Sequence, residues 1–199
     1  MSPKTARPLI LASSSPYRRR LLRRLALPFE WRDPAVDETA RPGEAPETLV
    51  RRLAKAKATA PALGSLPPDA LVIGSDQVAV LDGEVLGKPG DHERARAQLA
   101  RCSGREVVFY TGVCLYDARA ARAEVDCVPF TVVFRPLDAE GIERYLRHDR
   151  PYDAAGSFKA EGLGITLFRA LRGDDPTALE GLPLIRLTDM LAAAGVSLP

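Results

Sequence analysis

The two longest β-rich runs of the chain, Glu106–Tyr116 and Ala123–Phe134, constrain the fold more than any other feature. Valine, phenylalanine and tyrosine are frequent in these runs, and a short polar stretch separates them. This is the pattern of two antiparallel strands joined by a turn. Such a pair is rarely stable alone, so the rest of the chain has to supply neighbouring strands or helices.

Shorter runs predict the other strands. Asp82-Gly83 favours the tight turn of a hairpin between Val78–Leu81 and Glu84–Leu86, since this dipeptide accepts the left-handed backbone that such turns need. Short apolar runs predict the remaining strands, which are Leu9–Ala12, Phe29–Arg32, Ala70–Gly74 and Ile165–Leu171.

Helices are predicted between these strands. Ser15 is a candidate N-cap for a helix over Pro16–Leu25, and Pro46 begins a second helix that runs to about Ala60. Further helices are predicted over Asp91–Cys102, Leu137–Arg147 and Pro183–Ala193. Helices that alternate with strands around one long hairpin predict a mixed α/β fold, in which a twisted sheet has flanking helices.

Length and composition are those of an ordinary globular protein. The 199 residues suit a single α/β domain spanning 1–199. The net charge of +2 lacks the polybasic signature of a nucleic-acid binder, and no apolar run approaches transmembrane length. We therefore expect a soluble, cytoplasmic protein without a nucleic-acid or membrane partner.

The cysteines and histidines argue against several classes of site. Cys102, Cys114 and Cys127 show no C-x-x-C spacing, so we expect buried free thiols of a reducing compartment and neither disulfides nor a zinc site. His92 and His148 lack paired ligand spacing, which argues against a Ser-His-Asp hydrolase. The sequence also lacks the P-loop pattern G-x-x-x-x-G-K-[ST].

The segment Ser13–Arg18 is the first candidate site. It leads from a predicted buried strand through serines into a helix start, where free backbone N–H groups and the helix dipole favour an anion. Arg18 can add a bidentate contact to phosphate. An ordinary Ser-Pro cap followed by solvated arginines explains the segment equally well, so both interpretations stay open.

Carboxylates form a second candidate site. Asp76 follows the predicted strand Ala70–Gly74, and ligands of open α/β sheets bind beyond such strand ends. Asp76 could bind hydrated Mg²⁺ or orient a water molecule, although an aspartate that starts a turn is the commoner case. Asp37 and Glu38 form another acidic pair, either solvated or metal-binding. Oxygen ligands of this kind favour Mg²⁺ or Mn²⁺.

Three lysines could complete a phosphate-binding cluster. Lys57 lies on the apolar side of its predicted helix, one turn beyond Leu53, where a lysine is unexpected. Lys88 follows the predicted hairpin, and Lys159 lies in the glycine-rich stretch 155–164, where the backbone can approach a ligand closely. Each lysine taken alone is more often a solvated charge than a ligand.

Taken together, these segments resemble the Maf family of nucleoside triphosphate pyrophosphatases. The matching stretches run from Leu9 almost to the C-terminus in the family's order, and several motifs in order are far more specific than one. They are LILASSSPYRRRLL, VDETARPGEAPETLVRRLAKAKA, VIGSDQVAVLDGEVLGKP, CSGREVVFYTGV, YDAAGSFKAEGLG and LPLIRLTDML.

The resemblance implies two lobes around a deep cleft, as in the related inosine triphosphate pyrophosphatases, and metal-assisted cleavage between the α- and β-phosphates. Asp76 matches the family's catalytic acid, as proton acceptor or metal ligand, and Glu38 matches an acid that assists the metal or the water. Members are often dimeric, which leaves a homodimer open. The positions that match the family's phosphate-binding residues are Ser13, Arg18, Lys57 and Lys88.

Three positions bear on the substrate within this family. Members that act on dTTP and UTP typically have Arg, Thr and Gln where this chain has Tyr17, Gln77 and Glu161. Gln77 and Glu161 resemble the branch that hydrolyses 7-methyl-GTP, which typically has Trp at the first position. The smaller ring of Tyr17 predicts weaker stacking. An aromatic face and a carboxylate both suit a base that carries positive charge.

The resemblance therefore implies hydrolysis of 7-methyl-GTP to the monophosphate and pyrophosphate, which keeps modified nucleotides out of nucleic acids. Hydrolysis of dTTP or UTP is the alternative within the family. A nucleotide-binding regulator of cell division is a further alternative, since the family name refers to septum formation, but the presence of Asp76 argues against a protein without catalysis.

Overall fold

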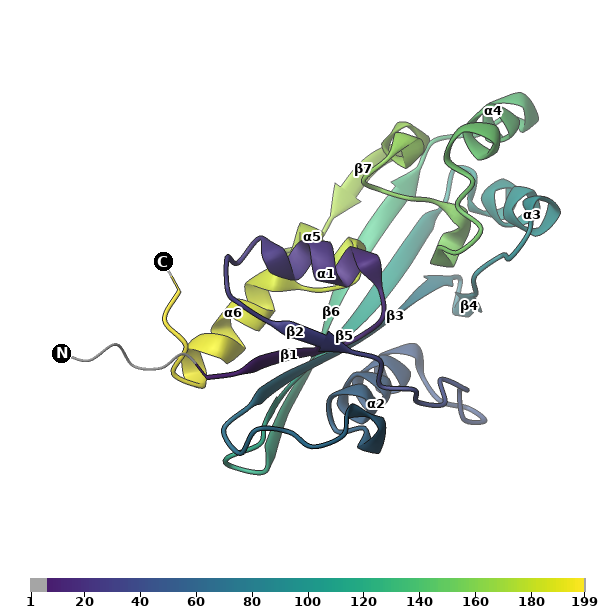
Figure 1. Ribbon diagram of the computed structural model, residues 1–199. Coiled ribbons are helices and arrows are strands. Elements are labelled where there is room, and N and C mark those ends of the chain that lie inside the picture. Colours follow the sequence, from purple (N-terminus) through teal and green to yellow (C-terminus); the bar gives the residue numbers. More distant parts are fainter. Residues whose placement is uncertain (1–6, 199) are drawn as a thin grey trace.

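The computed structural model describes residues 7–198, which form one open, mixed sheet with helices on both faces (Figure 1). Its strands are β1 (Leu9–Ala12), β2 (Glu30–Arg32), β3 (Leu71–Leu81), β4 (Glu84–Leu86), β5 (Glu106–Asp117), β6 (Arg122–Phe134) and β7 (Phe168–Arg172). The strand order is β2-β1-β3-β5-β6-β7, with β4 paired to β3 beside this path. β1 is parallel to β2 and β3, and the other pairs are antiparallel. The predicted mixed α/β sheet with flanking helices is confirmed.

Helices cover both faces and one end of this sheet. They are α1 (Pro16–Arg23), α2 (Pro46–Ala58), α3 (His92–Cys102), α4 (Ala139–Asp149), α5 (Pro176–Leu179) and α6 (Leu184–Ala193), with short 3-10 segments η1 (Pro61–Leu63), η2 (Ala155–Ser157) and η3 (Leu163–Leu167). α1, α5 and α6 lie on one side of the sheet and α2 on the other, while α3 and α4 lie at its far end near β4 and β7 (Figure 1). None of the helices within residues 7–198 is long and apolar enough to cross a membrane.

The apolar core divides the molecule into two lobes that share the long strands β3, β5 and β6. In the first lobe, one cluster packs α1 and α6 against one face of the sheet, and another packs α2 against the opposite face. In the second lobe, α3 and α4 close over the other ends of the same strands. The core of the second lobe contains edge-to-face aromatic rings, namely Phe109, Phe134, Phe158 and Phe168.

Two glycines of the sheet let α2 pack unusually close. A Cβ atom at Gly74 would collide with the backbone of Ala54, and one at Gly112 would collide with the backbone of Val50. At both positions the absence of a side chain allows the backbone of α2 to approach the sheet. The close packing fixes the height of α2 above β3 and brings the buried side of the helix next to the middle of that strand.

β3 differs from its prediction. The sequence favours separate strands over Ala70–Gly74 and Val78–Leu81, but one strand runs continuously over Leu71–Leu81. The polar residues between the two apolar runs keep strand geometry because β5 pairs with them without a break, so that Asp76 lies opposite Gly112. The polar residues thus place polar side chains in the middle of β3, while its backbone keeps strand geometry.

The strand predicted over Ile165–Leu171 also differs. β7 begins only at Phe168, because the residues before it form the 3-10 segment η3. Gly164 lies against the backbone of Lys159 so closely that a side chain there would collide with it. This contact folds the chain back before β7 can start.

The three thiols are free, as the sequence predicts. Cys102 and Cys114 are buried, and Cys127 is half-buried. Burial raises the pKa of Cys102 and Cys127 to about 11 and that of Cys114 to about 12. A thiol with so high a pKa is a poor nucleophile at neutral pH, which fits a structural role.

Candidate active site between the two lobes

A cavity of about 460 Å³ lies between the two lobes. Its walls come from distant parts of the sequence, which include the start of α1, the loop before α2, the middle of β3 and the stretches 153–161 and 179–181. The residues matched to the family's site all line this cavity, namely Ser13, Tyr17, Arg18, Glu38, Lys57, Asp76, Gln77, Lys88 and Glu161. Asp37, the other member of the acidic pair, does not line the cavity, and its carboxylate accepts hydrogen bonds from Thr39.

The cavity opens where β3 lacks a second neighbour. β1 pairs with β3 only as far as Gly74, and β4 pairs with it only from Ala79. Between these points, residues 75–78 pair with β5 on one side, and no other described strand pairs with them. Asp76 lies in this gap. The prediction that Asp76 follows a strand end is therefore wrong, and the strand that ends at the site is β1, at Ala12.

Lys57 is the centre of an ion triad in the cavity. Its Nζ lies 2.6 Å from Oδ1 of Asp76 and 2.6 Å from Oε1 of Glu38. Lys57 is only 4% exposed and Asp76 only 6%, whereas Glu38 reaches in from the exposed loop before α2. One buried ammonium thus faces two carboxylates, which leaves the triad with an excess negative charge.

The surroundings of Glu38 favour its ionised form. Partial burial raises the pKa of its carboxyl group, but the hydrogen bond from Lys57 and the positive charges of Lys57, Arg18 and Lys88 lower it further. The net effect is a pKa below the ordinary value of glutamate. Three of the predicted phosphate ligands, Lys57, Arg18 and Lys88, are thus close enough to Glu38 to lower the pKa of its carboxyl group.

The start of α1 supplies the predicted anion-binding segment. Ser15 caps the helix, since its Oγ accepts the N–H of Arg18, and the buried Ser13 accepts the N–H of Ser15 in turn. The Nε of Arg18 donates to the carbonyl of Gly181 at 2.8 Å, which orients the guanidinium. Burial lowers the pKa of Arg18, while the charges of Asp76 and Glu38 raise it.

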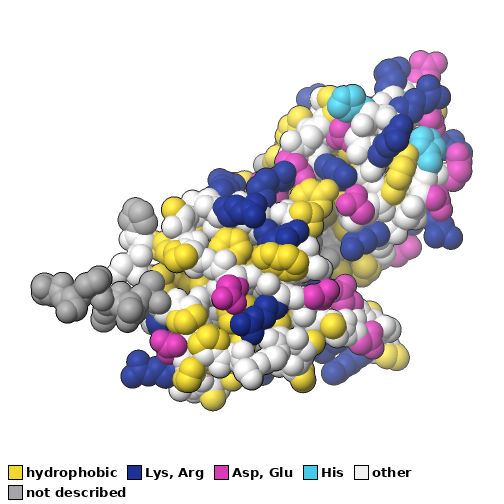
Figure 2. Space-filling model, in the orientation of Figure 1, with side chains coloured by type: hydrophobic (Ala, Val, Ile, Leu, Met, Phe, Trp, Pro, Cys, Tyr) yellow, Lys and Arg dark blue, Asp and Glu magenta, His cyan; other side chains and the backbone are white. Residues whose placement is uncertain are grey.

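The three consecutive arginines of α1 have different surroundings. Arg18 lines the cavity, and Arg19 and Arg20 do not. Arg19 lies over the ring of the exposed Trp31, 4.3 Å from its centroid. Arg20 is exposed and pairs with Glu161 of the cavity wall at 3.3 Å. Basic side chains gather over α1 (Figure 2). The helical spacing of the three residues thus admits only one of them to the cavity.

Tyr17, Gln77 and Glu161 line the cavity together. Nε2 of Gln77 donates to Oγ1 of Thr111 at 2.9 Å and to the carbonyl of Ala178 at 2.7 Å. Because the amide nitrogen faces acceptors, the amide oxygen is left to accept a hydrogen bond from a ligand. Glu161 forms an ion pair with Arg20 at 3.3 Å.

The segment that holds this part of the site, α5, is absent from the sequence prediction. Its carbonyls fix Gln77, and the carbonyl of Gly181 just beyond it accepts both from Arg18 and from Oγ of Ser75. The sequence does contain a signal for α5. Asp175 precedes a proline and accepts the N–H of Thr177, which is an ordinary helix N-cap.

The two carboxylates of the triad have the chemistry of a divalent-metal site. Oxygens of Glu38 and Asp76 lie 2.6 Å from the same nitrogen atom, so they converge on the position of one cation. No group of three or more His, Cys, Asp or Glu residues that could hold a metal occurs in residues 7–198. Two carboxylate oxygens are donors of the kind that Mg²⁺ accepts, because this cation takes few protein ligands and completes its shell with water and phosphate oxygens.

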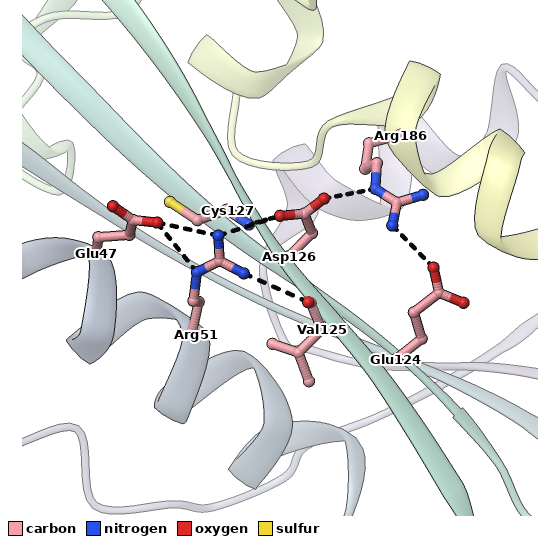
Figure 3. A network of polar contacts seen from close by, with 7 residues as sticks. All are labelled: Glu47, Arg51, Glu124, Val125, Asp126, Cys127 and Arg186. Carbon is pink, nitrogen blue, oxygen red and sulfur yellow. Dashed lines mark hydrogen bonds and ion pairs between the residues drawn. The ribbon is translucent and has the colours of Figure 1, made fainter.

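A second ion cluster lies away from the cavity, at the edge of the sheet (Figure 3). Asp126 of β6 pairs with Arg51 of α2 at 3.2 Å and with Arg186 of α6 at 2.6 Å. Glu47 pairs with Arg51, and Glu124 pairs with Arg186. α2 and α6 cover opposite faces of the sheet, so this cluster joins the two helix layers across the edge.

Fold and site together define a two-lobed α/β protein with a polar, charge-rich site between its lobes. The chain belongs to the Maf family, because the model of that family, described as "Maf-like protein", matches residues 8–194. The resemblance inferred from the sequence motifs is confirmed.

Curated relatives carry a more specific name. A "7-methyl-GTP pyrophosphatase" of Pseudomonas syringae pv. tomato is 60% identical over 191 residues, which are 96% of this chain and 98% of the relative. Proteins of the same name from Pseudomonas aeruginosa and Nitrosococcus oceani are 59% and 56% identical, over 96% and 94% of this chain and 98% and 93% of their own lengths. A solved structure, the Staphylococcus aureus Ham1 protein, is similar over 94% of this chain and 99% of its own, with a TM-score of 0.47 and 13% identity.

Proposed function

We propose that this protein is a metal-dependent pyrophosphatase that hydrolyses 7-methyl-GTP to 7-methyl-GMP and pyrophosphate, and so keeps a modified nucleotide out of nucleic acids. The names of its relatives support the substrate. The observation that carries the proposal is the triad in which Lys57 lies 2.6 Å from both Asp76 and Glu38, inside a cavity that also contains Ser13, Arg18 and Lys88.

The basic residues suit a triphosphate. Arg18 can bind phosphate oxygens as a fork, and Lys57 and Lys88 can bind them as point charges. The hydroxyl of Ser13 adds a hydrogen-bond donor. Together these groups hold the phosphates and stabilise the negative charge that develops on the leaving pyrophosphate.

Asp76 is the general base of the reaction. Its carboxylate accepts a proton from a water molecule, and the oxygen of that water bonds to the α-phosphorus. The bond between the α-phosphorus and the oxygen that bridges to the β-phosphorus breaks, and its electrons leave with pyrophosphate. Lys57, whose Nζ donates to Oδ1 of Asp76, holds this carboxylate in place until substrate enters.

Glu38 and Asp76 are the residues that would hold Mg²⁺ or Mn²⁺. When bound, the cation supplies positive charge that neutralises the phosphates. The charge of the cavity supports such a requirement. Its lining contains four basic and six acidic side chains, a formal charge of −2, so an anionic triphosphate needs additional positive charge to bind.

The 7-methylguanine ring of the substrate binds beside Tyr17, Gln77 and Glu161. The ring of Tyr17 stacks on a flat, positively charged purine. Glu161 accepts from the N1–H and 2-amino groups, and the amide oxygen of Gln77 adds a further acceptor. Thymine and uracil lack the 2-amino group and the positive charge, which is why the same residues disfavour dTTP and UTP.

A panel of nucleotides tests the proposal. Purified protein with Mg²⁺ is incubated with 7-methyl-GTP, GTP, dTTP or UTP, and pyrophosphate release is measured. We expect 7-methyl-GTP to give the highest kcat/KM. Release from dTTP and UTP without release from 7-methyl-GTP would instead establish the other activity of the family. A cytoplasmic location, a homodimer and a role in cell division remain predictions from the sequence.

A further inference from the structure

Glu180 is a cavity-lining carboxylate to which the proposed reaction assigns no role. It directly follows α5, whose last residue, Leu179, accepts a hydrogen bond from Gln77. Its side chain is 24% exposed, the same fraction as that of Glu161. Glu180 therefore stands beside the base-binding residues and is as enclosed as the one acidic residue already among them.

Arg20 joins Glu180 to Glu161. One guanidinium nitrogen, Nη2 of Arg20, lies 3.3 Å from Oε1 of Glu161 and 3.6 Å from Oε2 of Glu180. The same guanidinium lies 5.6 Å from the ring centroid of Tyr17. A planar, delocalised cation thus lies next to two carboxylates and an aromatic ring at the rim of the cavity.

The counter-ions of this group are more exposed than its carboxylates, since Arg20 is 53% exposed and Glu161 and Glu180 are each 24% exposed. Arg20 carries one positive charge against two carboxylates. Arg24 reaches Glu180 only at 4.0 Å, from a side chain that is 59% exposed, and solvent screens so long a contact strongly. Lys159 also lines the cavity, where it is paired with Asp153 at 3.2 Å and lies next to the hydroxyl group of Tyr17. The two partly enclosed carboxylates are thus paired only with arginines that are more than half exposed, and they attract a second, better enclosed cation.

We propose that Glu180 and Glu161 together form the site for the positively charged base of 7-methyl-GTP, and that Arg20 is their counter-ion in the absence of substrate. This inference rests on the proposed function. A 7-methylguanine base matches what Arg20 offers, because it is planar, delocalised and cationic and carries N–H donors on one edge. Guanine has the same donors without the charge. Glu180 therefore selects for methylation, and Arg20 competes with the base.

Glu180→Gln tests the role of the second carboxylate. This change keeps the shape and the hydrogen-bonding oxygen but removes the charge. We expect the ratio of kcat/KM for 7-methyl-GTP to that for GTP to fall about fivefold, as befits one partly exposed charge contact, while kcat/KM for GTP changes less than twofold. Glu140→Gln is the matched control, because Glu140 is exposed on α4 outside the cavity and its ratio should equal that of the wild type.

Arg20→Gln should have the opposite effect. Loss of the competing cation should raise the affinity for 7-methyl-GMP about threefold and that for GMP by less, because GMP offers the same donors without the charge; calorimetric titration without turnover measures both. Arg23→Gln is the control, since Arg23 is an exposed arginine of the same helix outside the cavity. The opposite signs also protect the test against a variant that is merely less stable.

The outcomes separate this inference from the proposed function. If the wild type prefers 7-methyl-GTP but Glu180→Gln keeps the ratio within twofold, the role of Glu180 is wrong and the function stands. If Arg20→Gln weakens binding of 7-methyl-GMP, Arg20 supports the carboxylates and does not compete with the base. If the wild type shows no preference for 7-methyl-GTP over GTP, both the proposed substrate and this inference fail.

Discussion

α2 contributes to two ion clusters that contain similar charged groups but differ in their surroundings. Near the end of the helix, Lys57 is almost fully buried between Asp76 and Glu38 in the cavity. Nearer its start, Arg51 pairs with Asp126 at the edge of the sheet, where both side chains are about one-third exposed. The first cluster contains more acid than base inside a cavity. The second lies in a solvent-accessible network that joins α2 to α6.

This difference in burial determines whether a cluster contributes to turnover or to stability. Charges that are enclosed interact strongly and are sensitive to any change of partner, whereas exposed pairs are screened by water and salt. We therefore expect changes in the buried triad to act on turnover and changes in the edge network to act weakly on stability. Four predictions test this division, from the largest expected effect to the smallest.

Asp76→Asn should have the largest effect. Loss of the base should lower kcat for 7-methyl-GTP about 10³-fold, since general-base catalysis contributes on that scale. Pyrophosphate release measures the rate, and a thermal melting curve shows whether the protein is folded. A folded variant that retains more than a tenth of the wild-type kcat would remove Asp76 from the chemistry.

Lys57→Met should lower kcat/KM about 10²-fold, because the triphosphate loses a buried cation and meets two unshielded carboxylates. Lys57 also helps to hold the pKa of Glu38 below its ordinary value, so its removal raises that pKa. The acid limb of the profile of kcat/KM against pH should therefore move to higher pH. Lys55→Met, on the exposed face of the same helix, is the control. Equal behaviour of the two variants would contradict the special role of Lys57.

Asp126→Asn should lower stability by about 1 kcal/mol, since Arg51 and Arg186 lose a shared but partly exposed partner. Burial raises the pKa of Asp126, but Arg186, the N–H of Cys127 and Arg51 lower it further, and the net shift is downward. The contribution of the ionised group is therefore present above the ordinary pKa of aspartate and is lost as pH falls through its folded-state pKa. Denaturant unfolding of both proteins near neutral and acidic pH measures this difference. A large change in kcat/KM would contradict the division between the clusters.

Glu47→Gln should have the smallest effect. Glu47 pairs with Arg51 one helical turn away, and its side chain is 55% exposed. Pairs of this kind contribute little, so the melting temperature should change by roughly 1 °C and turnover should not change. A shift as large as that of Asp126→Asn would mean that the edge network acts as one unit.

Much of this fold can be predicted from the sequence, because its local signals are strong. The long pair β5–β6, the cap at Ser15 and the Asp82-Gly83 turn all follow from residue patterns that the structure retains. The sequence does not predict the secondary structure of segments that are held by strand partners far away in the chain. The polar stretch 75–77 lies within a continuous strand because β5 pairs with it, and no periodicity in the sequence reveals that partner.

The site is predictable to a similar extent. Lysine on the apolar side of α2 is the signal for Lys57, and the structure shows what the sequence alone does not, namely that it contacts Asp76 and Glu38. Glu180 and Gly181 give no such signal. They reach the cavity because α5 turns the chain there, and a helix of four residues is easily missed.

A structure of the Asp76→Asn protein with 7-methyl-GTP and Mg²⁺ would test the central claim most directly. We predict that the triphosphate lies among Ser13, Arg18, Lys57 and Lys88, with the α-phosphorus facing residue 76 and the methylated base between Tyr17 and Glu161. A nucleotide bound in the reverse direction, with its base beside Lys57, or bound outside the cavity, would contradict it.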